Sequence, residues 1–282
     1  SDFPWRVESL SRLQAPADIK RIHEELKGGG LSIVIGTHAL FSSKVAFHNL
    51  GLVIIDEEQH FGVKQKEHLK KMAEGVHVLS MSATPIPRSL QMAVAGIREL
   101  SLIATPPVDR LGVHTFVMPY DALTVREAIL REFHRGGQVF YVCPRVADLE
   151  SIHETLMKLI PEVSMVVAHG GLSPAVLTEI MQGFEDRRFQ VLIATNIIES
   201  GLDIPNANTL IVHRSDLLGL SQLYQLRGRV GRSKTRGYAY FTYTPHKLLT
   251  ESALKRLEVL QMLDEIGSGF SLASHDMDIR GM

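Results

Sequence analysis

The chain has 282 residues, of which 45% are hydrophobic and 22% charged, an ordinary composition for a globular protein with room for two domains. Its formal net charge of −1 excludes a globally basic protein, so nucleic acid would have to bind through local patches. The single cysteine, Cys143, excludes an internal disulfide, and no apolar run is long enough to span a bilayer, so we expect a cytoplasmic protein.

Short runs rich in β-branched residues recur along the chain and predict strands. Most of them are apolar at consecutive positions, which is typical of parallel strands buried on both faces between helices. They lie at Ser32–Ile35, Leu52–Ile55, Val76–Ser80, Gln138–Val142, Val163–Ala168, Val191–Thr195 and Thr209–Val212. Helical patterns separate them, so the sequence predicts an α/β fold of repeated strand–helix–strand units.

Three of the helical patterns carry end signals. Leu123–His134 has an apolar stripe and is followed by Gly136, while Ser173 reads as an N-cap before Pro174. Leu248–Ile266 reads as a further helix that ends at a glycine pair.

Adjacent prolines within Ala104–Leu111 break helix and strand alike and predict a domain boundary. We therefore expect a first lobe at Ser1–Pro107, a second at Gly112–Pro245 and a helical tail at 246–282. Both ends of the chain read as cut points in a larger protein.

An acidic run follows the Leu52–Ile55 strand directly. Asp56 and Glu57 open this run at the carboxyl end of the strand, where ligands bind in open α/β sheets. An aspartate there can hold Mg²⁺ and an adjacent glutamate can polarise an attacking water, the pattern of a Walker B motif. A solvated acidic turn is the alternative, but the apolar strand before the pair favours function.

Polar residues follow other predicted strands as well. Ser82-Ala83-Thr84 comes after the next strand, where its hydroxyls can relay a hydrogen bond from a nucleotide site or simply cap a helix. Weaker candidates for phosphate contacts, each equally explained by an ordinary turn, are Thr37, His38, Arg145, His169 and Gly170.

The segment from Thr195 to Pro205 combines a turn with several polar groups. Gly201 permits a sharp turn near a ligand, and Asp203 can accept from a ribose hydroxyl or an arginine. Thr195 and Ser200 can donate to a DNA phosphate. A loop with ordinary helix caps is the alternative, but its place shortly before an arginine cluster favours function.

That cluster comprises Arg227, Arg229 and Arg232. The planar guanidinium suits phosphate, and a cation supplied by a neighbouring domain stabilises charge in phosphoryl transfer. The spacing of Arg229 and Arg232 predicts that both lie on one helical face, with Gln225 oriented toward the same site. A basic, solvated helix end is the alternative.

Other chemistries find less support. Thirteen histidines are scattered without metal-ligand spacing, and Cys143 has no evident partner for thiol catalysis. The phosphate-cradling loop Gly-x-x-x-x-Gly-Lys-Ser/Thr is nowhere in the sequence.

Taken in order, the motifs resemble those of superfamily-two helicases. Three stretches narrow the resemblance to the bacterial transcription-repair coupling factors: Asp56–Lys64, Ser82–Met92 and Leu102–Pro107. The resemblance covers nearly the whole chain. It implies two RecA-like lobes, with ATP and Mg²⁺ as cofactors and duplex DNA as a partner, in a translocase that displaces stalled RNA polymerase and recruits an excision-repair protein.

The resemblance also implies roles for individual residues. Asp56 and Glu57 would act in magnesium binding and hydrolysis, and Gln225, Arg229 and Arg232 would contact ATP. Coupling to ATP would involve Gln59, Ser82, Ala83, Thr84, Gly201 and Asp203. Leu254–Arg280 resembles a helical hairpin that moves the motor along DNA, and Arg256 and Arg280 are the DNA contacts expected there.

By this resemblance the chain is a motor fragment that begins after the phosphate loop, so that its first lobe lacks its opening strand. The regions that bind RNA polymerase and the excision-repair protein would lie outside it. Because the phosphate loop is missing, we expect the isolated chain to bind ATP weakly and to hydrolyse almost none.

Two alternatives remain open. A branch-migration helicase acting on forked DNA would share the motor motifs and the C-terminal segment. A DNA-binding scaffold that has lost its ATPase would explain the missing phosphate loop, although it need not retain both the acidic pair and the arginine cluster.

Overall fold

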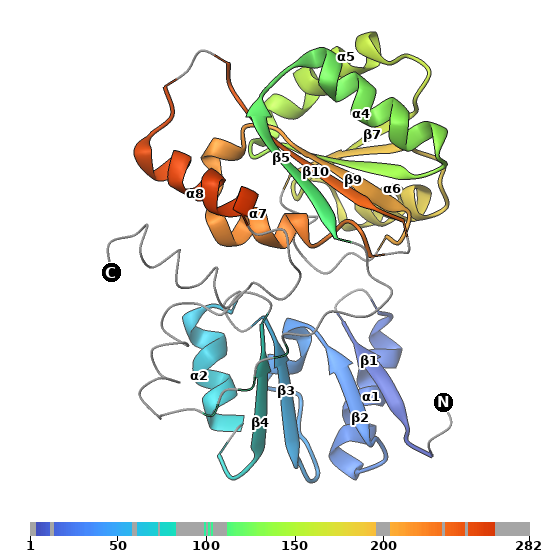
Figure 1. Ribbon diagram of the computed structural model, residues 1–282. Coiled ribbons are helices and arrows are strands. Elements are labelled where there is room, and N and C mark those ends of the chain that lie inside the picture. Colours follow the sequence, from blue (N-terminus) through green and yellow to red (C-terminus); the bar gives the residue numbers. More distant parts are fainter. Residues whose placement is uncertain are drawn as a thin grey trace. The chain divides into compact units, whose positions relative to one another are not determined.

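The computed structural model describes residues 4–11, 14–57, 61–72, 74–82, 99, 101, 103, 112–195, 204–232, 235–245 and 248–262 (Figure 1). The chain divides into two compact units, Ser1–Ala83 and Thr84–Met282. Strand pairing among the described residues is parallel in both units, which confirms the predicted α/β fold. No helix in the described ranges is long and apolar enough to cross a membrane.

The first unit contains two two-stranded parallel sheets, β1–β2 and β3–β4. Each pair is connected through a helix, so each is a strand–helix–strand unit. In chain order the elements are β1 (Val7–Leu10), α1 (Pro16–Gly28), β2 (Ile33–Gly36), the 3-10 helix η1 (His38–Phe41), β3 (Leu52–Asp56), α2 (Val63–Met72) and β4 (His77–Met81).

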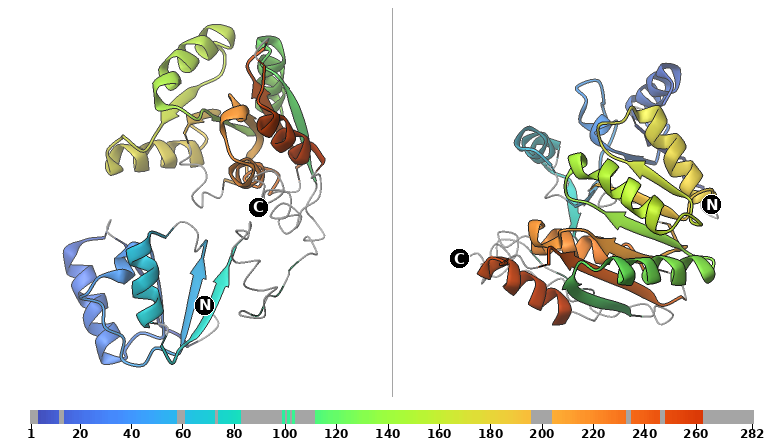
Figure 2. Two further views of the ribbon diagram at one scale, coloured as in Figure 1. Left: turned by 90° about the vertical axis from the view of Figure 1, so that its left-hand side faces the viewer. Right: turned by 90° about the horizontal axis from the view of Figure 1, so that it is seen from above.

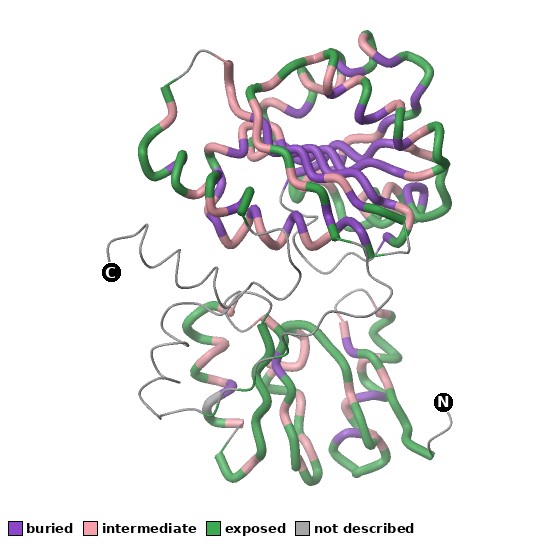
Figure 3. The backbone as a smooth tube through the Cα atoms, viewed as in Figure 1, coloured by how far each residue is buried: buried purple, intermediate pink, exposed green. Residues whose placement is uncertain are grey.

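The strands of the first unit are not buried on both faces, so that prediction is wrong here. Ile35 is 64% exposed, Ile54 is 57% exposed, and all of β4 is exposed. The fully buried core is small and centres on Leu10 and Ile22, between β1 and α1. Figure 3 shows the contrast with the second unit. An apolar run permits burial on both faces, but only packed layers over both faces produce it.

The second unit is built on a six-stranded parallel sheet with strand order β5-β10-β9-β6-β8-β7. Its strands are β5 (Val113–Pro119), β6 (Gln138–Val142), β7 (Met165–Ala168), β8 (Val191–Ala194), β9 (Ala207–Val212) and β10 (Gly237–Tyr243). Its helices are α4 (Ala122–His134), η3 (Val146–Asp148), α5 (Leu149–Leu159), α6 (Pro174–Glu185), η5 (Ser215–Leu217), α7 (Leu220–Arg227) and α8 (Glu251–Met262).

Helices cover both faces of this sheet (Figure 2). Helices α4 and α5 form one hydrophobic cluster with one face, and α6, α7 and α8 form a second cluster with the other. Every residue of β6, β8 and β9 is buried. The prediction of strands buried on both faces is therefore confirmed for the centre of this sheet.

Three strands, β1, β5 and β10, were not predicted. Each mixes polar with apolar residues, as in Val7-Glu-Ser-Leu10, and therefore lacks the consecutive apolar run used to find the others. Strand β5 lies at the sheet edge, where full burial is not required.

The helix signals are largely confirmed. Helix α4 begins after Asp121, whose side chain accepts from the Thr124 backbone N–H at 2.8 Å, and Gly136 follows it at φ 75°. Ser173 caps α6 as predicted. Helix α8 begins at Glu251 rather than at Leu248, because the hydroxyl of Thr250 accepts from the Ala253 N–H at 3.2 Å and so acts as the cap.

Candidate functional site

The acidic pair lies at the carboxyl end of β3. Asp56 is the last residue of the strand and is exposed, and Glu57 follows it. In the parallel pair β3–β4, Asp56 is in register with Met81, so the residues after both strands emerge at the same edge. The backbone N–H of Glu57 donates to the Met81 carbonyl at 3.0 Å and extends the ladder by one bond.

Tertiary structure brings two of the sequence motifs into contact at this edge. The hydroxyl of Ser82 donates to Oε2 of Glu57 at 3.3 Å. Glu57 has φ 51°, a left-handed backbone conformation that residues other than glycine rarely adopt. Such backbone strain concentrates at ligand and switch sites. Glu57 and Ser82 thus form one polar cluster at the carboxyl ends of adjacent strands.

The cluster has the donors that a magnesium–nucleotide complex needs. Mg²⁺ is commonly bound by one or two carboxylates, with water and nucleotide phosphates supplying the remaining oxygens. The exposed carboxylate of Asp56 fits that arrangement. Within the described residues, no three histidine, cysteine, aspartate or glutamate side chains gather into an all-protein metal site.

Thr37 and His38 follow β2 at the start of η1. The imidazole of His38 lies edge-on to the rings of Phe41 and Phe61, with centroid distances of 6.3 and 5.7 Å. These contacts hold an exposed histidine in one orientation. Gly36 is needed before them, because a Cβ there would lie 2.6 Å from the Leu10 carbonyl oxygen.

In the second unit, four candidate phosphate contacts lie at the carboxyl end of the sheet. Arg145 follows β6, His169 and Gly170 follow β7, and Thr195 follows β8. These three strands are parallel neighbours, so their carboxyl ends lie side by side. Arg145 and Gly170 are exposed, whereas Thr195 is only 9% exposed. Nδ1 of His169 accepts from the Gly171 N–H at 3.2 Å, which orients the ring.

The arginine cluster differs from the prediction. Helix α7 ends at Arg227, so Arg229 and Arg232 lie beyond it and do not share a helical face. Arg227 is 4% exposed and donates to the Thr115 hydroxyl at 2.8 Å, which ties α7 to β5. After the helix, Gly231 has φ 68°, a left-handed conformation that favours glycine. Sequence spacing alone could not place this helix end.

The other predicted side chains of this region are partly engaged within the unit. Gln225, on α7, is half-buried. Nε of Arg232 donates to the Gly228 carbonyl at 3.2 Å. Arg256 donates to the Asp216 carbonyl at 3.1 Å and to the Ser252 hydroxyl at 2.6 Å. Arg256 therefore joins α8 to η5.

A buried polar cluster at the ends of β6 and β9 was not found from the sequence. The Tyr141 hydroxyl lies 3.2 Å from Nδ1 of His213, and the Tyr120 ring packs edge-on against the same imidazole. Burial lowers the pKa of His213 and raises that of Tyr141 well above its ordinary value. Burial also raises the pKa of the Cys143 thiol, which disfavours the reactive thiolate.

Several predicted residues lie outside the described residues. These are Gln59, Ala83, Thr84, Ser200, Gly201, Asp203 and Arg280. Their roles remain predictions, as do the roles assigned to the described candidates.

Comparison with known proteins relates this geometry to a family. Residues 5–93 match the DEAD/DEAH box helicase family, and residues 122–234 match the helicase conserved C-terminal domain. The transcription-repair-coupling factors of Rickettsia conorii and Escherichia coli (strain K12) are 53% and 49% identical over 99% and 100% of this chain. The chain spans only about a quarter of their lengths, 25% and 24%.

The chain is also similar to solved structures of helicases. RecG bound to a three-way DNA junction matches 99% of this chain and 37% of its own with a TM-score of 0.77 and 35% identity. Saccharomyces cerevisiae Dbp5 bound to RNA and ADP BeF3 covers 97% of this chain and 81% of its own at a TM-score of 0.62 and 13% identity, which shows the fold alone. The chain therefore belongs to the superfamily-two helicases, with their RecA-like fold, and is homologous along its whole length to part of the transcription-repair-coupling factors.

Proposed function

We propose that the chain is the motor core of an ATP-dependent translocase on double-stranded DNA. Identity of about half to the transcription-repair-coupling factors, over the whole chain, is the observation that carries this proposal. By the names of those relatives, the whole protein would couple transcription to repair. The whole protein would displace stalled RNA polymerase and recruit an excision-repair protein. It would bind each of these partners through regions outside this chain.

The contact between Glu57 and Ser82 supports the ATPase part of the proposal. Asp56 would hold the Mg²⁺ of bound ATP, and the ion would neutralise developing charge on the phosphates. Glu57 would orient and polarise the attacking water. Ser82 would couple the nucleotide site to the rest of the motor. Its hydroxyl donates to Glu57 at 3.3 Å, so a change in the position or charge of that carboxylate would alter the hydrogen bond.

Cationic and amide side chains complete the proposed chemistry. Gln225, Arg229 and Arg232 would contact the phosphates of ATP and stabilise charge as the terminal phosphoryl group is transferred. Coupling roles are proposed as well for Gln59, Ala83, Thr84, Gly201 and Asp203.

The proposed DNA contacts come from both units, and they act on the sugar-phosphate backbone. They are Thr37, His38, Arg145, His169, Gly170, Thr195, Ser200, Arg256 and Arg280. Because the net charge is −1, these local groups rather than the overall field would draw the duplex. Cytoplasmic location, where such DNA lies in bacteria, is part of the proposal.

ATP hydrolysis with and without duplex DNA tests the proposal on this chain and on a longer protein that includes a phosphate loop. We expect DNA-stimulated hydrolysis only from the longer protein, because this sequence has no Gly-x-x-x-x-Gly-Lys-Ser/Thr loop. In the longer protein, Glu57→Gln should slow hydrolysis by about 10²- to 10⁴-fold and leave ATP binding intact. Exposed Glu74 is the matched control, and Glu74→Gln should leave the rate unchanged.

Robust hydrolysis by this chain alone would contradict the predicted need for the loop. An inactive longer protein would favour a DNA-binding scaffold that has lost its ATPase.

A branch-migration helicase is the second candidate, favoured by the 35% identity and TM-score of 0.77 with RecG. Two measurements on the complete protein distinguish the candidates. One is whether it captures RNA polymerase, and the other is whether it prefers three-way junctions to linear duplex. Junction preference without polymerase capture would favour the second candidate.

A further inference from the structure

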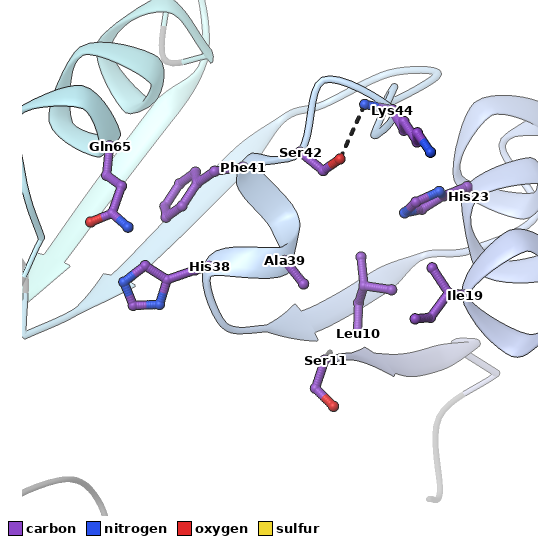
Figure 4. A pocket seen from close by; sticks show the side chains of 10 residues that line it. All are labelled: Leu10, Ser11, Ile19, His23, His38, Ala39, Phe41, Ser42, Lys44 and Gln65. Atoms are coloured by element: carbon purple, nitrogen blue, oxygen red, sulfur yellow. Dashed lines mark hydrogen bonds between the residues drawn. The ribbon is translucent and has the colours of Figure 1, made fainter. Parts of the chain in front are cut away.

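A surface pocket in the first unit lies beside the segment Thr37–His38, and of its lining residues only His38 has a role in the function proposed above. Its volume is about 470 Å³, and it is lined by side chains from the end of β1, from α1, η1 and α2, and from the segment after η1. In Figure 4, His38 and Phe41 lie on one side of the pocket, and His23 and Lys44 lie on the other.

The polar groups of the pocket are donors suited to an anion. Three lining side chains, His23, His38 and Lys44, are basic, and no aspartate or glutamate is among the described residues that line it. A histidine ring provides an N–H donor in either protonation state, and the lysine ammonium provides three. Within the described ranges Lys44 takes part in no ion pair, so its charge is available to a ligand.

The pattern of α1 explains why no carboxylate enters the pocket. Glu25 pairs with Arg6 at 2.9 Å and with Arg21 at 3.3 Å, so its charge is directed to other cations. His23 instead shares a face with Ile19, four residues earlier, and both line the pocket. The acidic side chains of this helix therefore balance the charge of neighbouring arginines and of Lys20 instead of the charge in the pocket.

We propose that this pocket binds a backbone phosphate of duplex DNA, with Lys44 and His23 as its donors. The inference rests on the proposed function and extends the proposed DNA contact from Thr37 and His38 to the α1 side of the first unit. His38 belongs to both groups, so one strand of the duplex would run from the end of β2 past the pocket. The contact recognises phosphate alone and carries no base specificity.

Duplex binding by this chain, followed as anisotropy of a labelled DNA over a range of KCl concentrations, tests the inference. Each lost phosphate contact reduces the slope of log K against log salt by about 0.9. Lys44→Gln should therefore reduce the slope by about one and weaken binding by about 3-fold more at 50 mM than at 200 mM salt. The loss should be the same for duplexes of different sequence.

Lys20→Gln is the matched control. Lys20 lies on α1, is exposed, pairs weakly with Glu24 at 3.9 Å and is outside the pocket, so its loss should leave the slope unchanged. His23→Ala should weaken duplex binding, and His23→Gln, which retains an N–H donor, should restore part of it.

Three outcomes would overturn the inference. Equal slopes for Lys44→Gln and Lys20→Gln, with the unchanged chain still binding DNA, would refute the pocket alone. Absence of salt-dependent duplex binding by the unchanged chain would refute the proposed function together with it. If Lys44→Gln weakened the binding of inorganic phosphate and left duplex binding unchanged, the pocket would take a free anion instead of DNA.

Discussion

At the scale of single residues, one oxygen of a buried carboxylate, Oε2 of Glu132, is held by two donors at once. Glu132 of α4 is fully buried, yet it accepts from the hydroxyl of Thr209 in β9 and from the guanidinium of Arg135. A buried carboxylate without such donors would destabilise the fold strongly. The hydrogen bond from Thr209 to Glu132 therefore holds α4 on the sheet in addition to apolar packing.

Thr209→Val should lower the free energy of unfolding by about 1–3 kcal/mol, because it removes one donor and leaves a buried oxygen less satisfied. Urea denaturation followed by circular dichroism measures the change. Thr155→Val serves as the control, since Thr155 is exposed on α5 and bonds only its own helix. Equal midpoints for the two variants would show that the Thr209 hydroxyl contributes nothing.

At the scale of elements, α8 is part of the second unit and not an appendage to it. Its Leu257 and Leu260 belong to the same buried cluster as the inner face of α7, and Arg256 bonds the Asp216 carbonyl of η5. The helix that would begin the proposed translocation segment is thus packed directly against the helix that precedes Arg229. Movement of one should be transmitted to the other.

Leu260→Ala should cost about 2–5 kcal/mol of unfolding free energy, as expected for a fully buried leucine. Leu254, on the same helix, is 46% exposed, so Leu254→Ala should cost less than about 1 kcal/mol. Thermal or urea unfolding compares the two. Similar losses for both would mean that α8 does not dock through its Leu257–Leu260 face in solution.

At the scale of the whole molecule, the two units differ in how much apolar surface they bury. Among the described residues, the second unit has two extensive clusters on opposite faces of its sheet, whereas the first has one small cluster beside α1. Large apolar side chains of β2, β3 and β4 are exposed, including Ile35, Ile54 and Leu79. Hydrophobic burial is the main favourable contribution to folding, so the first unit should be the less stable.

Native-state hydrogen exchange tests this difference. Amides of β6, β8 and β9 should exchange only through global opening of the second unit, while those of β3 and β4 should exchange much faster. Unfolding should accordingly show two transitions instead of one. Uniform protection across both units, with a single transition, would contradict the expectation.

The sequence predicted those features of the fold and the site that depend on neighbouring residues in the chain. The strand ends that place Asp56, Glu57 and Ser82 follow from apolar runs and the turn residues after them, and the structure confirms those strands to within a residue. Caps such as Ser173 are local as well, because their partners lie three residues away. Motif order, which is purely sequential, was sufficient to indicate the family.

Only the tertiary structure decided which of these residues meet and which are buried. The sequence placed Ser82 and Glu57 twenty-five positions apart, and the parallel pairing of β3 with β4 brings them to 3.3 Å. It grouped Arg227 with the arginines proposed to bind phosphate, but Arg227 is buried and bonds Thr115, more than a hundred residues away, so it joins α7 to β5. The exposure of β4 likewise depends on layers that no local pattern encodes. Periodicity specifies what a segment can bury, while contacts between distant segments determine what it does bury.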